Sequence, residues 1–159
     1  MTIHDWFDKY GESHQNPVNK AVHWVCVPLI FFSILGLLSL IPFGFVQEHL
    51  QAGWVPYVHF GTVLVLFGVF FFLRLSGSIA LGMAVVSALM LWFVKASHAT
   101  FGGDAWVFFT AVFVLSWIGQ FIGHKIEGAK PSFFDDLKFL MIGPAWLLHF
   151  IYRKAGIRF

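Results

Sequence analysis

The stretch YGESHQNPVNKAVHWVCVPL holds His14, Asn19 and His23 where polar sequence gives way to apolar sequence. Pro17 suits the first turn of a helix. A helix from that point puts Asn19 and His23, four residues apart, on one face, and His14 lies in the polar loop just before it. Asn19 is expected to orient a histidine or to cap backbone groups, a supporting role that metal sites commonly need.

A second polar face lies in WIGQFIGHKIEGAKP, closer to the C-terminus. Gln120, His124 and Glu127 follow one another at spacings of four and three residues, which a helix brings to one side. Ionisable groups at membrane depth are costly, so they are candidates for function. We expect this face to meet the first one, with His14 and His124 close together.

Neutral imidazole and carboxylate are natural ligands of iron, zinc or copper, and two histidines with one carboxylate suit oxygen-activating Fe(II). We predict His14, His23 and His124 as catalytic metal ligands, with Glu127 or His149 completing or supporting the set. The sequence holds no HExxH-type motif. Spacing alone therefore does not specify the metal.

The whole chain is unusually apolar, which predicts membrane lipid as its surroundings. Of its 159 residues 58% are hydrophobic and 11% are charged, about half the charged fraction usual in soluble domains. The length predicts a single domain over residues 1–159. A formal charge of +2 is too small for a nucleic-acid partner, and a single cysteine excludes an internal disulfide.

Four apolar runs predict an all-α bundle of four transmembrane helices. Each run has 16 to 19 residues without a charge, and with flanking residues each reaches roughly the 20 that cross a hydrocarbon core about 30 Å thick. Helices are favoured because they satisfy their own backbone groups in lipid. The runs are Val25–Ile41, Val55–Leu73, Ile79–Val94 and Ala105–Ile122.

A fifth apolar stretch, Leu137–Tyr152, is interrupted by Gly143 and Pro144. With four spans and the N-terminus inside, nine of the ten Lys and Arg residues face the cytoplasm and only Lys95 lies outside, as the positive-inside rule requires. A fifth span would carry the last three positive charges across the membrane. We therefore predict a C-terminal re-entrant or interfacial helical hairpin, with both termini in the cytoplasm.

The same topology sorts the eight histidines by side of the membrane. The inner set is His4, His14, His23, His124 and His149, and the outer set is His49, His59 and His98. Because the inner set also has the polar neighbours, we expect the site on the cytoplasmic side of the inner membrane of a bacterium, or of the endoplasmic reticulum of a eukaryote. The outer histidines are predicted to be structural.

The two quoted stretches, together with IGPAWLLHF, resemble the metabolism-of-phytosphingosine membrane dioxygenases over most of the chain. This resemblance implies an Fe(II)-dependent dioxygenase that shortens 2-hydroxy fatty acids by one carbon, with molecular oxygen as co-substrate. By position, the family's characteristic histidines map to His14, His23 and His124. Many relatives carry Glu where this chain has His149, which leaves the fourth ligand open.

Two other classes of function are compatible with the same residues. A membrane protein that binds haem or quinone, without catalysis, would use pairs of histidines as axial ligands. A purely structural or transport protein would not depend on His14, His23 and His124. The chain length of the substrate and the number of subunits, a homo-oligomer included, are not fixed by the sequence.

Overall fold

The computed structural model describes residues 1–128 and 139–159, and its regular elements are all helices, which confirms the predicted all-α class. Residues 129–138, which include the start of the predicted hairpin, lie outside the described part. The elements are α1 (Ile3–Gly11), α2 (Pro17–Ser39), α3 (Gly44–Gln47), η1 (Val55–Tyr57), α4 (Phe60–Leu73), α5 (Gly77–Phe101), η2 (Gly102–Asp104), α6 (Ala105–Glu127) and α8 (Ile142–Ala155).

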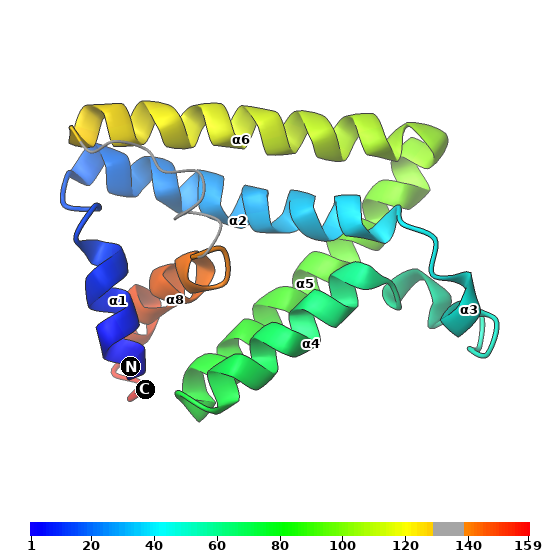
Figure 1. Cartoon of the computed structure of the whole chain (residues 1–159), viewed down its shortest axis with the longest axis horizontal. Coiled ribbons are helices and arrows are strands. Elements are labelled where there is room, and N and C mark those ends of the chain that lie inside the picture. Colours follow the sequence, from blue (N-terminus) through cyan, green and yellow to red (C-terminus); the bar gives the residue numbers. More distant parts are fainter. Residues whose placement is uncertain (129–138) are drawn as a thin grey trace.

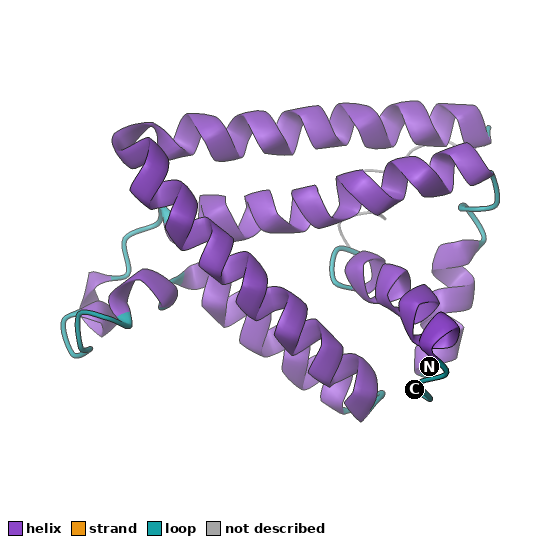
Figure 2. Ribbon diagram, turned by 180° about the vertical axis from the view of Figure 1, so that it is seen from behind, coloured by secondary structure: helices purple, strands orange, loops and turns teal. Residues whose placement is uncertain are grey.

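Two long helix pairs form the frame of the molecule. Helices α2 and α6 run side by side along its length, and α4 and α5 form a second pair (Figure 1). The pairs meet at one end and diverge at the other, where α1 and α8 lie between them (Figures 1 and 2). The N- and C-termini are neighbours at this open end, where the rings of His4 and Phe159 are 5.4 Å apart.

Helix α2 begins where the sequence predicts. Pro17 is in its first turn, and the side chain of Asn16 accepts hydrogen bonds from the backbone N–H groups of Val18 and Asn19. The first turn of a helix has no internal partners for these donors. The cap therefore fixes the point at which the loop carrying His14 joins the helix carrying His23.

Helices α2 and α6 approach closely because small residues lie between them. A Cβ atom added at Gly36 would overlap the fully buried ring of Phe109, and one added at Gly123 would overlap the side chain of Asn19. Close backbone approach at small residues is the usual packing device for helices in lipid. The second of these contacts brings α6 against α2 beside His23 and His124.

Replacing Gly36 with alanine is expected to lower the free energy of unfolding by about 1–3 kcal/mol, because the added methyl group must displace the buried ring of Phe109. Thermal unfolding of the detergent-solubilised protein measures this loss. Gly103→Ala is the matched control, since a Cβ atom there meets no atom within 4 Å. Equal effects of the two substitutions would contradict the close helix approach.

The four transmembrane helices predicted from the sequence are not confirmed by the described chain. Two continuous stretches are long and apolar enough to cross a membrane, Pro17–Ser39 and Gly77–Glu127, with mean hydropathies of 2.2 and 2.1. The run Val55–Leu73 is divided, because His59 caps a new helix, α4, after the turn η1. With 14 residues, α4 is about 21 Å long, short of a membrane core of about 30 Å.

The outward faces of the long helices are strongly apolar. Leu66, Phe67, Leu81 and Leu115 each expose between 65% and 68% of their surface. Side chains of this kind over several helices exceed what a monomer in water usually exposes. The two apolar stretches and these faces are compatible with a membrane protein.

Only the later part of the predicted C-terminal hairpin lies in the described residues. Residues 139–159 hold one helix, α8, whose first turn contains Gly143 and Pro144. Proline is tolerated in a first turn because its missing N–H has no helical partner there. Every residue from Ile142 to His149 is buried, so α8 packs among α1, α2 and α5.

Candidate metal centre

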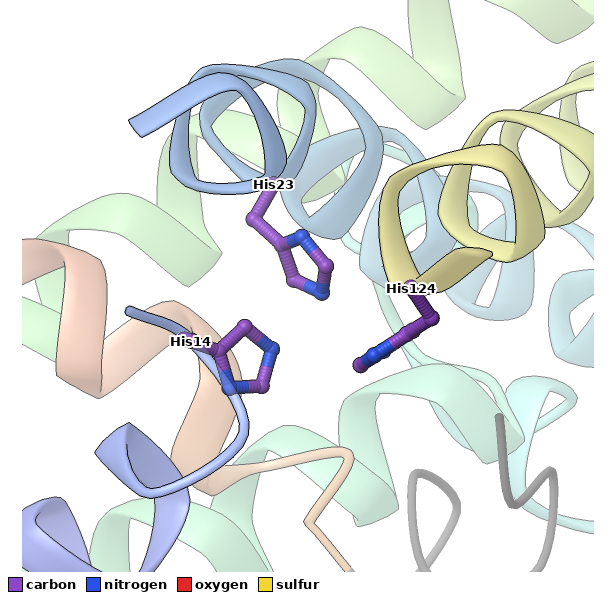
Figure 3. Close-up of side chains that lie close together, drawn as sticks. All are labelled: His14, His23 and His124. Atoms are coloured by element: carbon purple, nitrogen blue, oxygen red, sulfur yellow. The ribbon is translucent and has the colours of Figure 1, made fainter. Parts of the chain in front are cut away.

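Three histidines from separate parts of the chain converge at the open end of the α2–α6 pair. His14 comes from the loop before α2, His23 from α2 and His124 from α6, and their rings face one another (Figure 3). One nitrogen of each ring lies within 4.8 Å of the others. Ring centroids are 4.2 Å apart for His14 and His23, 5.2 Å for His14 and His124, and 5.0 Å for His23 and His124. The predicted meeting of His14 and His124 is therefore confirmed.

Backbone carbonyls fix the orientation of two of these rings. His14 Nδ1–H donates to the carbonyl oxygen of Tyr10 at 2.6 Å, and His23 Nδ1–H donates to that of Asn19 at 2.9 Å. A carbonyl oxygen can only accept, so Nδ1 carries the proton and Nε2 of the neutral ring carries the lone pair. Both rings are held in the tautomer that binds a metal through Nε2.

The burial of the three rings favours their use as ligands of a metal ion. His14, His23 and His124 expose 1%, 1% and 3% of their surface, and burial lowers the pKa of His14 to about 4. Nε2 of His14 is buried without a hydrogen-bond partner among the described residues. A buried polar atom of this kind is costly unless a ligand satisfies it. The donor set therefore fits a transition-metal ion.

Glu127 ties the loop that carries His14 to the end of α6. Its Oε1 accepts from the backbone N–H of Gln15 at 2.8 Å and of Asn16 at 3.0 Å. Its Oε2 accepts from the N–H of Asn16 at 2.8 Å and from Nδ2 of Asn19 at 3.0 Å. Both carboxylate oxygens are thus engaged with the chain, and Glu127 is not part of the converging group of three histidines.

Asn19 extends the same connection into α2. It is fully buried, and besides Glu127 its Nδ2 donates to the carbonyl oxygen of Ser13 at 3.3 Å. Its backbone oxygen accepts from His23. One residue therefore links the loop before α2, the end of α6 and the orientation of a candidate ligand.

His149 lies near the three histidines without joining them. Its ring stacks on Phe7 with a centroid distance of 4.9 Å, and its Nδ1–H donates to the carbonyl oxygen of Trp146. Burial lowers the pKa of His149. The residue lines a pocket of about 260 Å³ whose wall also contains His14. The remaining polar residue of the α6 face, Gln120, is buried beside a cavity of about 30 Å³.

Two aromatic residues at the site were not predicted from the sequence. The ring of Tyr10 stacks on His14 at 4.3 Å with an interplanar angle of 11°, and Trp146 lies 5.4 Å from His14. The position of Tyr10, four residues before His14, is a local signal that could have identified it. Trp146 is brought there by the packing of α8, for which the local sequence carries no signal.

These features define an all-helical protein with apolar outer faces and a buried centre of three histidines. The chain belongs to the Mpo1-like family, since the family model described as 2-hydroxy-palmitic acid dioxygenase Mpo1-like matches residues 1–155. This is the family that the two histidine-bearing stretches resemble. No curated protein and no solved structure gave a significant match.

Proposed function

We propose that the protein is a membrane-bound, Fe(II)-dependent dioxygenase that shortens 2-hydroxy fatty acids by one carbon. The observation that carries this proposal is the convergence of three buried imidazoles, with one nitrogen of each within 4.8 Å of the others. The substrate class follows from the family description, which names a 2-hydroxy-palmitic acid dioxygenase. Fe(II) is chosen because imidazole ligands suit it and because it activates oxygen in non-haem oxygenases.

In this proposal His14, His23 and His124 hold the iron through ring nitrogens. Bound iron would supply the redox chemistry that activates oxygen. It would also supply a Lewis acid that a 2-hydroxy acid can chelate. Tyr10 and Asn19 keep the first two rings in the required tautomer through their backbone carbonyls. Glu127 and the side chain of Asn19 hold the loop and the two helices together around the site.

The proposed reaction needs no reductant besides the substrate. A 2-hydroxy acid and one molecule of oxygen balance to an acid shorter by one carbon, carbon dioxide and water. The 2-carbon and the carboxyl carbon together lose four electrons, and oxygen takes up four on reduction to the level of water. The stoichiometry is therefore complete with the two substrates that the proposal names.

A pocket of about 260 Å³ gives the substrate a path toward His14. Its charged lining is mixed, with Lys20 beside Asp8 and Glu12, and its apolar lining includes the rings of Phe7, Trp146 and Phe150. The aromatic rings accept the first methylene groups of an acyl chain, and the ammonium group of Lys20 attracts a carboxylate against the opposing charge of the two acidic residues. An amphiphilic acid fits this wall better than a small polar acid does.

The arrangement of the three rings does not fit the haem-binding alternative. Two axial histidines lie on opposite faces of a porphyrin, whose plane must pass between the rings. Here the ring centroids are only 4.2 to 5.2 Å apart and the third ring closes the gap. Three imidazoles pointing at one another favour a single ion.

The proposed membrane setting has both termini and the histidine centre on the cytoplasmic side. The two apolar stretches support insertion, and nine of ten Lys and Arg residues fall on that side in the sequence-derived topology. The neighbouring termini agree with this arrangement (Figure 1). The membrane is the inner membrane in a bacterium or the endoplasmic reticulum in a eukaryote.

The deciding experiment is an oxygen-electrode assay on anaerobically purified protein supplied with Fe(II) and 2-hydroxypalmitate. We expect one molecule of pentadecanoic acid and one of carbon dioxide for each molecule of oxygen consumed. Palmitate, which lacks the 2-hydroxyl group, is the matched control and is expected to remain intact. Turnover of equal rate with zinc would contradict an oxygenase, because zinc has no redox chemistry.

A further inference from the structure

We propose a second binding site, at the opposite end of α2 from the histidine centre, for the anionic headgroup of an amphiphile. A pocket of about 480 Å³ lies between the end of α2, the turn η1 and the end of α5. Its polar lining includes Ser39, Gln47, His59, Lys95 and His98. None of these residues is part of the metal centre or has a role in the dioxygenase reaction proposed above.

His59 presents a buried donor without a protein acceptor. Its Nδ1 accepts from the backbone N–H of Gly61 at 3.1 Å as the cap of α4. An accepting nitrogen carries no proton, so the neutral ring has its N–H at Nε2. That atom is buried and has no hydrogen-bond partner among the described residues, and His59 as a whole is 3% exposed. His59 lines the pocket, and a ligand oxygen that reaches Nε2 from there would satisfy this donor.

His98 forms a fixed polar wall of the same pocket. The hydroxyl of Ser39 donates to the carbonyl oxygen of Gly36 at 2.6 Å. Since a hydroxyl has one hydrogen, it accepts from Nε2–H of His98 at 2.7 Å. The bond joins the ends of α2 and α5, so the pocket is shaped before any ligand arrives.

Lys95 gives the pocket its charge. Its ammonium group donates to the hydroxyl of Tyr57 at 3.3 Å and lies 4.9 Å from the centre of that ring. Two of its three donors stay available to a ligand. None of the described residues that line the pocket is acidic. One cation and one buried N–H donor, with no carboxylate to oppose them, select an anionic oxygen group such as a phosphate.

The surroundings favour an amphiphile over a free anion. The segment between α2 and η1 exposes 66% of Phe45 and 63% of Trp54, and it projects at this end of the molecule with α3 (Figure 1). Exposed aromatic residues of this kind anchor proteins at a lipid interface. Val55 and Pro56 of η1 also line the pocket. An acyl chain thus has apolar contacts beside the polar pocket, which a free anion does not use.

The test measures binding of dodecyl phosphate and of inorganic phosphate to the full-length protein in a nonionic detergent, by isothermal titration calorimetry. We expect saturable binding of dodecyl phosphate, weakened about tenfold or more by Lys95→Met. His59→Asn should weaken it similarly, because asparagine retains the acceptor that caps α4 but cannot replace the Nε2 donor. Nitrogen-15 spectra of the His59 ring should show the Nε2 proton shifting on binding.

The matched control is Lys154→Met, which removes one exposed positive charge in α8 and is expected to leave binding unchanged. An equal loss of affinity in this variant would show that the effect of Lys95→Met comes from net charge alone, which would overturn the proposed site. Absence of saturable binding would overturn it as well. If inorganic phosphate bound as tightly as dodecyl phosphate, the pocket would take a free anion and the assignment to an amphiphile would be wrong.

Discussion

Single replacement of His14, His23 or His124 by alanine is expected to abolish both iron binding and the oxygen-dependent loss of 2-hydroxypalmitate. The three rings converge with one nitrogen each within 4.8 Å of the others, so each supplies a third of the proposed ligand set. With one ring removed, two imidazoles hold Fe(II) too weakly to survive gel filtration. Metal analysis after desalting measures the first loss, and the oxygen electrode measures the second.

His49→Ala is the matched control for these variants. His49 is a surface residue whose side chain is 77% exposed and lies 3.5 Å from the carboxylate of Glu48, so its loss should change neither readout. Thermal unfolding of each metal-free variant separates loss of the site from loss of the fold. Full iron content in any two of the three variants would contradict the shared centre.

The start of α2 shows how far the local sequence determines this site. Asn16 and Pro17 form a cap and a first turn whose effects act over a few residues, so the position of His23 on α2 could be predicted. The same holds for the shared helical face of Gln120, His124 and Glu127. That these two faces meet followed from the charge pattern, which put both on one side of a membrane.

The parts that could not be predicted depend on unusual local helix starts or on contacts between distant segments. The division of Val55–Leu73 comes from His59, whose side chain caps α4 although histidine is not among the preferred capping residues. Pro144 was read as a break because its helix was assumed to begin earlier, whereas α8 begins at Ile142. The approach of Trp146 to His14 requires α8 to pack beside α1, which no pattern in residues 139–159 indicates.

Glu127 shows that residue type and spacing alone do not identify a metal ligand. As a carboxylate one turn after His124, it has the composition and spacing of a metal ligand. In the structure both of its oxygens accept hydrogen bonds from Gln15, Asn16 and Asn19. The donors are two backbone N–H groups and one side-chain amide from the far end of the chain. A pattern of residue types does not show which backbone groups will meet a side chain. We therefore assign Glu127 a positioning role.

This assignment predicts that Glu127→Gln weakens Fe(II) binding about 10–100-fold without abolishing it, as loss of a residue supporting a ligand typically does. Glutamine keeps one acceptor oxygen but loses the charge and the second acceptor, so the loop carrying His14 is held less firmly. Saturating Fe(II) should restore most of the turnover, because all three imidazoles remain. Calorimetric titration with Fe(II) under anaerobic conditions measures the affinity.

Asn19→Ala tests the same connection from its other end, since Nδ2 of Asn19 donates to Oε2 of Glu127 at 3.0 Å. Asn19→Ala removes this bond and Glu127→Gln weakens it by removing the charge, so the double variant should lose less affinity than the two single losses multiplied together. Glu48→Gln, at a carboxylate 65% exposed and far along the chain, should leave the affinity unchanged. If Glu127→Gln eliminates iron binding as completely as His124→Ala, even at saturating metal, then Glu127 is itself a ligand. Strict additivity in the double variant would separate Asn19 from Glu127 and leave the two residues with independent roles at the centre.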